Sequence, residues 1–368
     1  MDIFSLLREA ATKGASDLHL VSSSPPLLRV NGALEMIDGA LPINANEISQ
    51  AFLQITTPEQ RESFHHNLEL DFNYTLKGVG YLRCNAAQQR GAISLAVRLL
   101  PAEIPTIDGL GLPELYKELA MKQRGLIVVT GPTGSGKSTS QAAMIRYLNE
   151  NESRHVVTIE DPIEYVHPTI KCAITQRQLG SDTLSFPEAL RRVLRQDPDV
   201  ILVGEMRDLD TAAAVLSIAE TGHLILTTGH APSASQAVER VIDLFPPHER
   251  HLAQTRLASL LIAVLFQTLV PRADGSGRIA ATEILLANPA AKNLIREGKI
   301  YQLPNVIRTH RGIGMLSLDE SLVDLYHQRV ITRESLFSFC SDQKEVEKLI
   351  GGVGPNASRQ AIRAGILR

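Results

Sequence analysis

Tryptophan is absent from this sequence, and cysteine is scarce, with three residues among 368. The cysteines, Cys84, Cys172 and Cys340, lie too far apart for a CxxC metal site, and an odd number does not fit a framework of disulfides. Positive charge is not in excess, because 37 Lys and Arg residues stand against 40 Asp and Glu residues. Proteins that bind nucleic acid along a groove usually carry a basic excess and stacking aromatic side chains. We therefore predict reduced thiols, a cytoplasmic location and no direct contact with nucleic acid.

Signals for export or membrane insertion are also missing. The amino-terminal residues do not combine a basic segment with an apolar one, as a secretory signal does. The longest apolar run, residues 257–266, is interrupted only by Ser259 and reaches about half of the 18 or more residues that a membrane span needs. We interpret this run as a buried core helix and predict no transmembrane segment. Any association with a membrane is then expected to depend on partner proteins.

The length and the apolar content of 44% allow two or three domains, each with its own core. Residues 1–100 predict a mixed domain that begins with a short amphipathic helix and continues as an antiparallel meander. Within it, residues 81–85 and 93–97 have the pattern of strands, and glycine-containing turns precede both. Prolines and glycines between residues 101 and 113 predict a linker.

Residues 114–288 differ from the first hundred, because apolar runs of strand length alternate there with helical patterns. Strands are expected at residues 126–130, 155–159, 200–203 and 224–228. Such alternation is typical of βαβ units and of a buried, parallel-rich sheet. Residues 289–368 change to helical periodicity and predict a helical carboxy-terminal region, whose end from Gly351 onward is expected to be poorly fixed. The predicted fold class is therefore α/β for the central domain.

A glycine-rich loop lies between the first of these strands and a helix expected to begin near Thr139. It matches the pattern G-x-x-x-x-G-K-[ST], although a glycine-rich turn can fit that pattern by chance. Glycines let the backbone approach phosphates, Lys137 spans the β- and γ-phosphates of ATP, and Ser138 ligates Mg²⁺. The predicted nucleotide-binding residues are Gly131, Pro132, Thr133, Gly134, Ser135, Gly136, Lys137, Ser138 and Thr139.

Acidic residues follow two other predicted strands. Glu205 follows the strand expected at residues 200–203, where a Walker B acid reaches Mg²⁺. Gly204 replaces the usual Asp, so metal contact depends on Glu205. Glu160, Asp161 and Glu164 follow the strand at residues 155–159. Clustered acids are costly unless they hold a cation or transfer a proton, so one of them is a candidate base for the attacking water. The alternative is a solvated acidic loop.

Two histidines and three arginines complete the candidate site. Because nucleotides bind beyond the carboxyl ends of strands, His230 is placed to meet the γ-phosphate. His223 lies at the opposite end of the same strand. It either has a functional role or is a histidine packed and hydrogen bonded beside the sheet. Arg195, on a helix, is expected to reach phosphate, a neighbouring acid or solvent. Arg83 and Arg98 project from the meander strands and are candidates for arginine fingers that enter a neighbouring subunit's site, or for surface charge.

The four motifs, at residues 131–139, 159–164, 203–208 and 223–230, resemble the Walker A, Asp box, Walker B and His box of the type II and type IV pilus secretion ATPase superfamily. Segments 14–20 and 288–297 extend the resemblance over most of the chain, which is most similar to PilT-type retraction ATPases. The resemblance implies a PAS-like α+β amino-terminal domain, a RecA-like P-loop domain and a homohexamer that hydrolyses ATP to retract type IV pili in twitching motility. It also implies Glu164 as catalytic glutamate, Glu205 as Walker B glutamate, and arginines of the first domain, here Arg83 and Arg98, that complete the site.

The implied partners are an inner-membrane platform protein and the pilus machinery, at the cytoplasmic face of the membrane. The sequence departs from the family at Gly229, where leucine is usual, and at Ala291 and Lys292, within a segment linked to productive retraction. Extension and type II secretion ATPases usually add a larger amino-terminal region and a four-cysteine zinc knuckle, which are missing here. A PilU-type accessory ATPase, a RecA-like nucleic acid translocase and a non-catalytic regulator are the alternatives.

Overall fold

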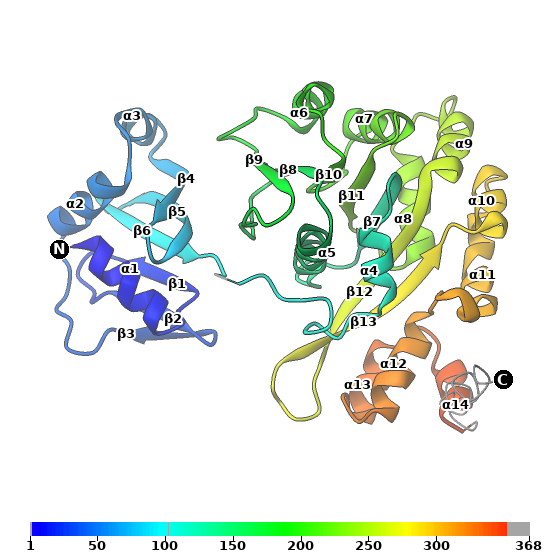
Figure 1. Cartoon of the computed structure of the whole chain (residues 1–368). Coiled ribbons are helices and arrows are strands. Elements are labelled where there is room, and N and C mark those ends of the chain that lie inside the picture. The colour runs from blue at the N-terminus through cyan, green and yellow to red at the C-terminus, as the bar shows by residue number, and fades with distance from the viewer. Residues whose placement is uncertain (1, 102, 352–368) are drawn as a thin grey trace. The chain divides into compact units, whose positions relative to one another are not determined.

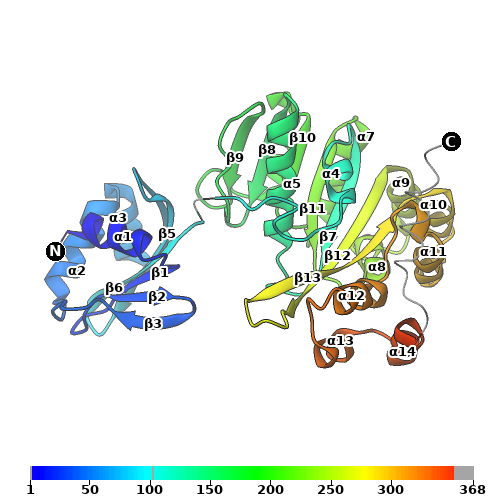
Figure 2. The same ribbon diagram turned by 60° about the horizontal axis from the view of Figure 1, so that its bottom comes forward.

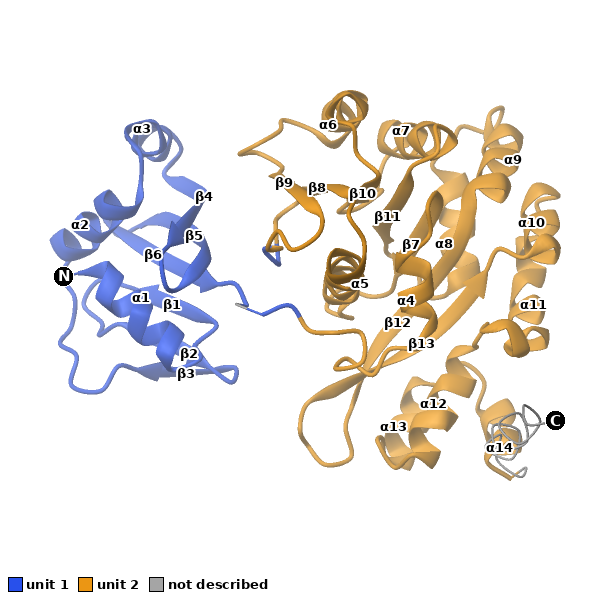
Figure 3. Ribbon diagram, viewed as in Figure 1, with its two compact units in different colours: residues 1–104, 164–166 blue, residues 105–163, 167–368 orange. Residues whose placement is uncertain are grey.

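The computed structural model describes residues 2–101 and 103–351, which form two compact units (Figure 1 and Figure 3). The first unit comprises the residues up to 104 together with residues 164–166, and the second comprises the others. The segment predicted to be poorly fixed lies, from residue 352 on, outside the described residues. No helix among the described residues is long and apolar enough to cross a bilayer.

The first unit is α+β, with a six-stranded antiparallel sheet in the order β3-β2-β1-β6-β5-β4. Its elements are α1 (Ile3–Thr12), β1 (Asp17–Leu20), β2 (Leu27–Val30), β3 (Ala33–Met36), α2 (Ala45–Ile55), α3 (Pro58–Asn67), β4 (Glu69–Leu76), β5 (Gly80–Gln89) and β6 (Ala92–Leu99). The initial helix and the strands expected at 81–85 and 93–97 are confirmed. Helices α2 and α3 were not expected, although Asn44 and Thr57 begin them with complete capping boxes.

The second unit is built on a seven-stranded sheet in the order β13-β12-β7-β11-β10-β8-β9. All neighbours in it are parallel except β12 and β13. The strands are β7 (Gly125–Thr130), β8 (His155–Glu160), β9 (Ala173–Gln178), β10 (Val200–Val203), β11 (Leu224–Gly229), β12 (Leu261–Pro271) and β13 (Arg278–Leu286). The four predicted strands and the parallel-rich α/β fold are confirmed.

Each face of this sheet has its own apolar core, because successive side chains of a strand point to opposite faces. Ile127 and Val129 pack in one core with α4 and α5, whereas Leu126 and Val128 pack in the other with α6 to α9 (Figure 2). The covering helices are α4 (Leu115–Ala120), α5 (Lys137–Asn151), α6 (Phe186–Val193), α7 (Leu209–Glu220), α8 (Ala234–Asp243) and α9 (Arg250–Leu260). The apolar side chains of the inner strands β7, β8, β10 and β11 are therefore buried.

The interpretation of residues 257–266 as a core helix is wrong. Helix α9 ends at Leu260, and from Leu261 the run forms β12, which lies between β7 and β13. A strand inside a sheet that is covered on both faces carries a continuous apolar run, and such a run cannot be told from a buried helix by its periodicity. The length of β12 places Gln267 beside the glycine-rich loop that follows β7.

The carboxy-terminal region is helical, as predicted, as far as residue 351. Its helices are α10 (Pro289–Arg296), α11 (Leu303–Thr309), α12 (Leu318–His327), α13 (Arg333–Phe339) and α14 (Gln343–Gly351). Glu283 of β13 connects this region to the rest of the unit. Its Oε1 accepts a hydrogen bond from the backbone N–H of Ala234, at the start of α8, at 2.6 Å. A hydrogen bond from the backbone N–H of Leu318, at the start of α12, also stabilises the charged form of the Glu283 carboxylate. Burial nevertheless raises the pKa of Glu283.

Candidate nucleotide-binding site

The glycine-rich loop has the backbone that a phosphate cradle requires. Strand β7 ends at Thr130 and α5 begins at Lys137, two residues earlier than expected. Gly131 and Gly136 have φ angles of 149° and 86°, and a Cβ on Gly131 would lie 2.2 Å from the carbonyl oxygen of Gln267. Lys137 is buried and its Nζ donates to the carbonyl oxygens of Gly131 (2.9 Å) and Pro132 (3.0 Å). The loop is therefore wrapped around the lysine, and only glycine fits at Gly131.

The carboxyl ends of β10 and β11 bring two other predicted residues together. Glu205 follows β10 by two positions and His230 directly follows β11, and these neighbouring strands are parallel. The His230 Nε2 lies 3.8 Å from Glu205 Oε2, and the Arg207 Nε lies 2.6 Å from the same oxygen. The sequence therefore placed Glu205 and His230 at the correct edge of the sheet.

Electrostatics link these residues to the glycine-rich loop. Burial raises the pKa of Glu205 and the nearby charge of Asp161 adds to the rise, whereas Arg207 and Lys137 oppose it. Burial also lowers the pKa of His230, and the positive charges of Lys137 and Arg207 lower it further. These effects favour the neutral form of His230, in which one ring nitrogen can donate a hydrogen bond and the other can accept one.

Packing explains why Gly204, and not an acidic residue, precedes Glu205. A Cβ on Gly204 would lie 3.2 Å from the Cα of Glu160 and 3.2 Å from the carbonyl oxygen of Ile159, both at the end of β8. The backbone N–H of Gly204 donates to that same Ile159 oxygen at 2.7 Å. An aspartate at this position would push β10 away from β8. Gly204 therefore permits close contact between β10 and β8.

Thr130 connects the glycine-rich loop to the loop after β11. Its Oγ1 accepts the backbone N–H of Ala231 at 2.9 Å and donates to the carbonyl oxygen of Ala231 at 3.4 Å. Both residues are buried. Ala231 directly follows His230, and Thr130 directly precedes the glycine-rich loop. The Thr130 side chain therefore fixes the position of His230 relative to that loop.

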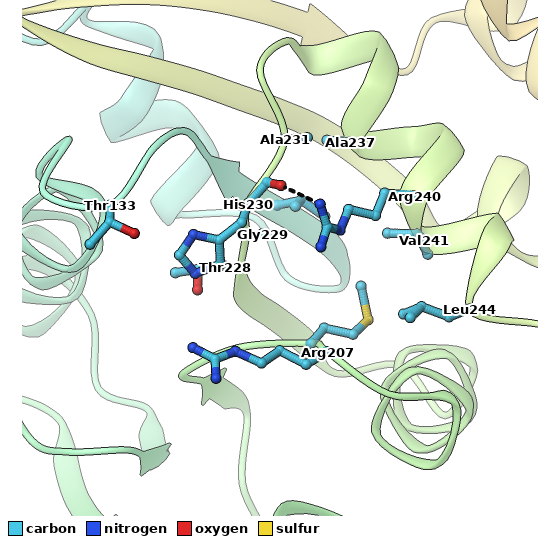
Figure 4. A pocket seen from close by; sticks show the side chains of 12 residues that line it. Thr133, Arg207, Thr228, Gly229, His230, Ala231, Ala237, Arg240, Val241 and Leu244 are labelled. Carbon is cyan, nitrogen blue, oxygen red and sulfur yellow. Dashed lines mark hydrogen bonds between the residues drawn. The ribbon is translucent and has the colours of Figure 1, made fainter.

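A cavity of about 460 Å³ opens beside these residues (Figure 4). Thr133 of the glycine-rich loop, Arg207 and His230 line it together with apolar side chains of α8. Arg240 of α8 donates from its guanidinium to the carbonyl oxygen of His230 at 2.9 Å and so holds the loop after β11. Sequence reasoning missed Arg240, and its only signal was its place on the helix that follows the histidine.

The three acids near the end of β8 are arranged differently from one another. The Glu160 carboxylate accepts hydrogen bonds from Thr158 Oγ1 at 2.5 Å and from Gln176 Nε2 at 3.0 Å, so the sheet itself holds it. Asp161 contributes its charge to the cluster around Glu205. Glu164 belongs, with residues 165 and 166, to the first unit. The assignment of Glu164 as the catalytic base therefore stays a prediction.

Two predicted residues lie away from this cluster. His223 precedes β11 at the opposite edge of the sheet, and its Nδ1 lies 2.9 Å from Thr221 Oγ1 and 3.2 Å from the carbonyl oxygen of Ile218. Arg195 is exposed in a short 3-10 helix (Leu194–Gln196) that follows α6, and is not part of the α-helix as expected. The structure thus separates the two histidines, as the length of their strand required.

In the first unit, Arg83 and Arg98 are direct cross-strand neighbours on β5 and β6. The adjoining residue on β1 is Asp17, whose Oδ1 lies 2.8 Å from Arg98 Nε. Although burial opposes it, hydrogen bonds from Ser16 and Arg98 lower the pKa of Asp17. Adjacent like charges repel one another, so the ion pair with Asp17 offsets part of the cost of placing the two arginines side by side.

The residues present fit a magnesium ion bound with a nucleotide. No group of three or more His, Cys, Asp or Glu side chains is arranged to hold a metal within the described part of the chain. Mg²⁺ in nucleotide sites does not need such a group, because water and phosphate oxygens supply most of its ligands. Ser138, the second residue of α5, and the partly buried Glu205 are the residues that would supply the two protein oxygens of that arrangement.

Comparison with known proteins agrees with this geometry. The model of the type II/IV secretion system protein family matches residues 2–303. The chain is 44% identical, over 91% of its length and 97% of the relative, to the type IV pilus retraction ATPase PilT of Pseudomonas aeruginosa. It is 40% identical to the type IV pilus ATPase PilU of the same species, over 95% of this chain and 91% of the relative. A crystal structure of the pilus retraction motor PilT with bound ADP matches with a TM-score of 0.88 and 41% identity, over 95% of this chain and 99% of that chain.

Proposed function

The chain belongs to the type II/IV secretion system protein family, and from this premise we propose that it is an ATP-hydrolysing motor that retracts type IV pili. The observation that carries the proposal is the convergence of Lys137, Glu205 and His230 at the carboxyl edge of one parallel sheet. That edge is where P-loop ATPases bind and split their nucleotide. The identity to PilT extends over 97% of that protein, which supports the same task for this chain.

In the proposed mechanism, the backbone N–H groups of the glycine-rich loop and the start of α5 bind the phosphates of ATP. Lys137 leaves its carbonyl partners to stabilise the charge that develops on the β- and γ-phosphates. Ser138 and Glu205 would hold Mg²⁺, which would neutralise phosphate charge. His230, neutral and fixed by its loop, donates a hydrogen bond toward the γ-phosphate.

Glu164 accepts the proton of the attacking water, as its place in the family motif implies. Arg83 and Arg98 enter the site of a neighbouring subunit and stabilise the charge of the transition state, which requires a ring of subunits. We therefore propose a homohexamer. It works at the cytoplasmic face of the inner membrane through a platform protein of the pilus machinery.

A PilU-type accessory ATPase is the second candidate, because the identity to PilU is 40% over 91% of that protein. Both candidates hydrolyse ATP, so the chemistry of the site does not separate them. They differ in what they do alone: a motor retracts pili without help, whereas an accessory ATPase adds to a motor that is already present.

The test combines an enzymatic and a cellular measurement. The purified chain should hydrolyse ATP only with Mg²⁺, and Lys137→Ala should abolish hydrolysis; stimulation by single-stranded DNA would favour a translocase. Deletion of the gene should leave excess surface pili and abolish twitching. Loss of surface pili would identify an extension ATPase, retained twitching with reduced force would identify an accessory one, and loss of protein secretion would identify a type II secretion ATPase.

A further inference from the structure

Gln267 lies outside all four motifs but contacts the glycine-rich loop at several points. Strand β12 pairs with β7 as far as Phe266 opposite Thr130, so Gln267 lies beside the first residue of the loop. Its side chain is 1% exposed, and its Nε2 donates to the carbonyl oxygen of Ser135 at 2.7 Å. The same Nε2 would lie 3.2 Å from a Cβ on Gly136. The loop is therefore closely packed against this glutamine.

The hydrogen bond to Ser135 fixes the direction of one peptide group. The peptide between Ser135 and Gly136 is trans, so its C=O and N–H point to opposite sides. With the Ser135 oxygen held toward Gln267, the Gly136 N–H points away from that side chain. A free N–H at the start of a helix is the group that binds phosphate in such loops.

We infer that Gln267 is a positioning residue, whose side-chain amide orients the Gly136 N–H toward the β-phosphate of the bound nucleotide. The inference rests on the proposed function, since it concerns the same nucleotide site. It adds a fifth element, a side chain from β12, to the four motifs that the sequence contains.

Stability does not explain why a glutamine occupies this position. The Oε1 of Gln267 is buried and has no hydrogen-bond partner within residues 2–101 and 103–351, and the same holds for Ser135 Oγ. A buried acceptor without a partner destabilises the folded state, and an apolar side chain of similar size would avoid that cost. The donor Nε2, which the loop uses, is the part of the side chain that such a replacement would lose.

The matched control is Thr282, which lies directly opposite Gln267 on β13 and is 2% exposed. Thr282→Val also replaces a buried polar group by an apolar one at the same level of the sheet. It lies on the strand beyond β12, and none of the hydrogen bonds described for the glycine-rich loop involves it. The two variants therefore share the change in polarity and differ in the bond to Ser135.

The experiment measures the affinities of the full chain for ADP and for AMP, which lacks the β-phosphate. Gln267→Met keeps the length of the side chain but cannot donate, and should weaken ADP binding about fivefold to tenfold, as expected for one hydrogen bond. AMP binding should not change, and Thr282→Val should bind both nucleotides as the parent does. Gln267→Leu, uncharged and also unable to donate, should reproduce the selective loss of ADP affinity if the Met variant fails to fold.

Two outcomes would overturn the inference. In one, Gln267→Met keeps the parent ratio of ADP to AMP affinity while the parent binds ADP normally. In the other, both affinities fall together, which would show a general loss of packing. A parent chain that binds no ADP would instead overturn the proposed function, and the inference with it.

Discussion

Gly204→Ala should destabilise the second unit, although it adds only a methyl group at the end of a strand. The new Cβ would lie 3.2 Å from the Cα of Glu160 and 3.2 Å from the Ile159 carbonyl oxygen, and both are backbone atoms. They cannot rotate away as a flexible side chain would, because β8 is paired with β10 on one side and β9 on the other. Overpacking of this kind costs about 1–3 kcal/mol. For a domain of this size that corresponds to a fall in Tm of about 2–12 °C.

Thermal and urea denaturation of the full chain, followed by circular dichroism, would measure this loss. Gly229→Ala is the matched control, because Gly229 also ends a strand of the sheet and its nearest contact to a new Cβ is the Thr130 Oγ1 at 3.4 Å. It should change the free energy of unfolding by less than about 0.5 kcal/mol. Equal stability of the two variants would refute the close approach of β10 to β8. Gly204→Asp, which restores the usual pair of acids, should be no more stable than Gly204→Ala.

Three further predictions concern charged side chains. Glu164→Gln should keep ATP binding and lose nearly all hydrolysis, because an amide cannot accept the proton of water; near-parent turnover would move the base to Glu160 or Asp161. Arg98→Ala should lower turnover far more than nucleotide affinity, since an arginine finger acts on transition-state charge, and equal small losses would make it surface charge. Burial raises the pKa of Glu283 above 4.5, so its contribution to stability is present below that pH and is lost as the pH rises through the raised value. Glu283→Gln should therefore gain stability relative to the parent with rising pH, and parallel stability curves would contradict this.

The parallel sheet and its motifs could be predicted because local sequence determines them. Each buried strand is a short apolar run, and the parallel connection places the residue after each run at the same edge, which is why Glu205 and His230 were found. Helix α3 was missed because Phe64 is its only buried residue. Its sequence therefore lacks the stripe of apolar residues that predicts an amphipathic helix. Its local signals were the capping box at Thr57 and the proline at its first position.

Residues that act through contacts distant in sequence could not be predicted. The requirement for glycine at position 204 comes from the backbone of β8, more than 40 residues earlier in the chain. Gln267 reaches a loop 132 residues away from it. In both cases the pairing of strands, and not the sequence around the residue, determines the partner. Arg240 differs, because it contacts from helix α8 a backbone oxygen ten residues earlier, which no pattern of side chains could reveal.

The paired hydrogen bonds of Thr130 have a consequence for how the site moves. Local opening of a protein occurs in cooperative segments, and a segment is defined by the bonds that must break together. Ala231 cannot leave its position without breaking both bonds to Thr130, and Thr130 directly precedes the glycine-rich loop. The free energy of opening either loop therefore includes the cost of freeing the other. The phosphate cradle and the histidine beside it form one mechanical unit, so a displacement of the cradle also displaces His230.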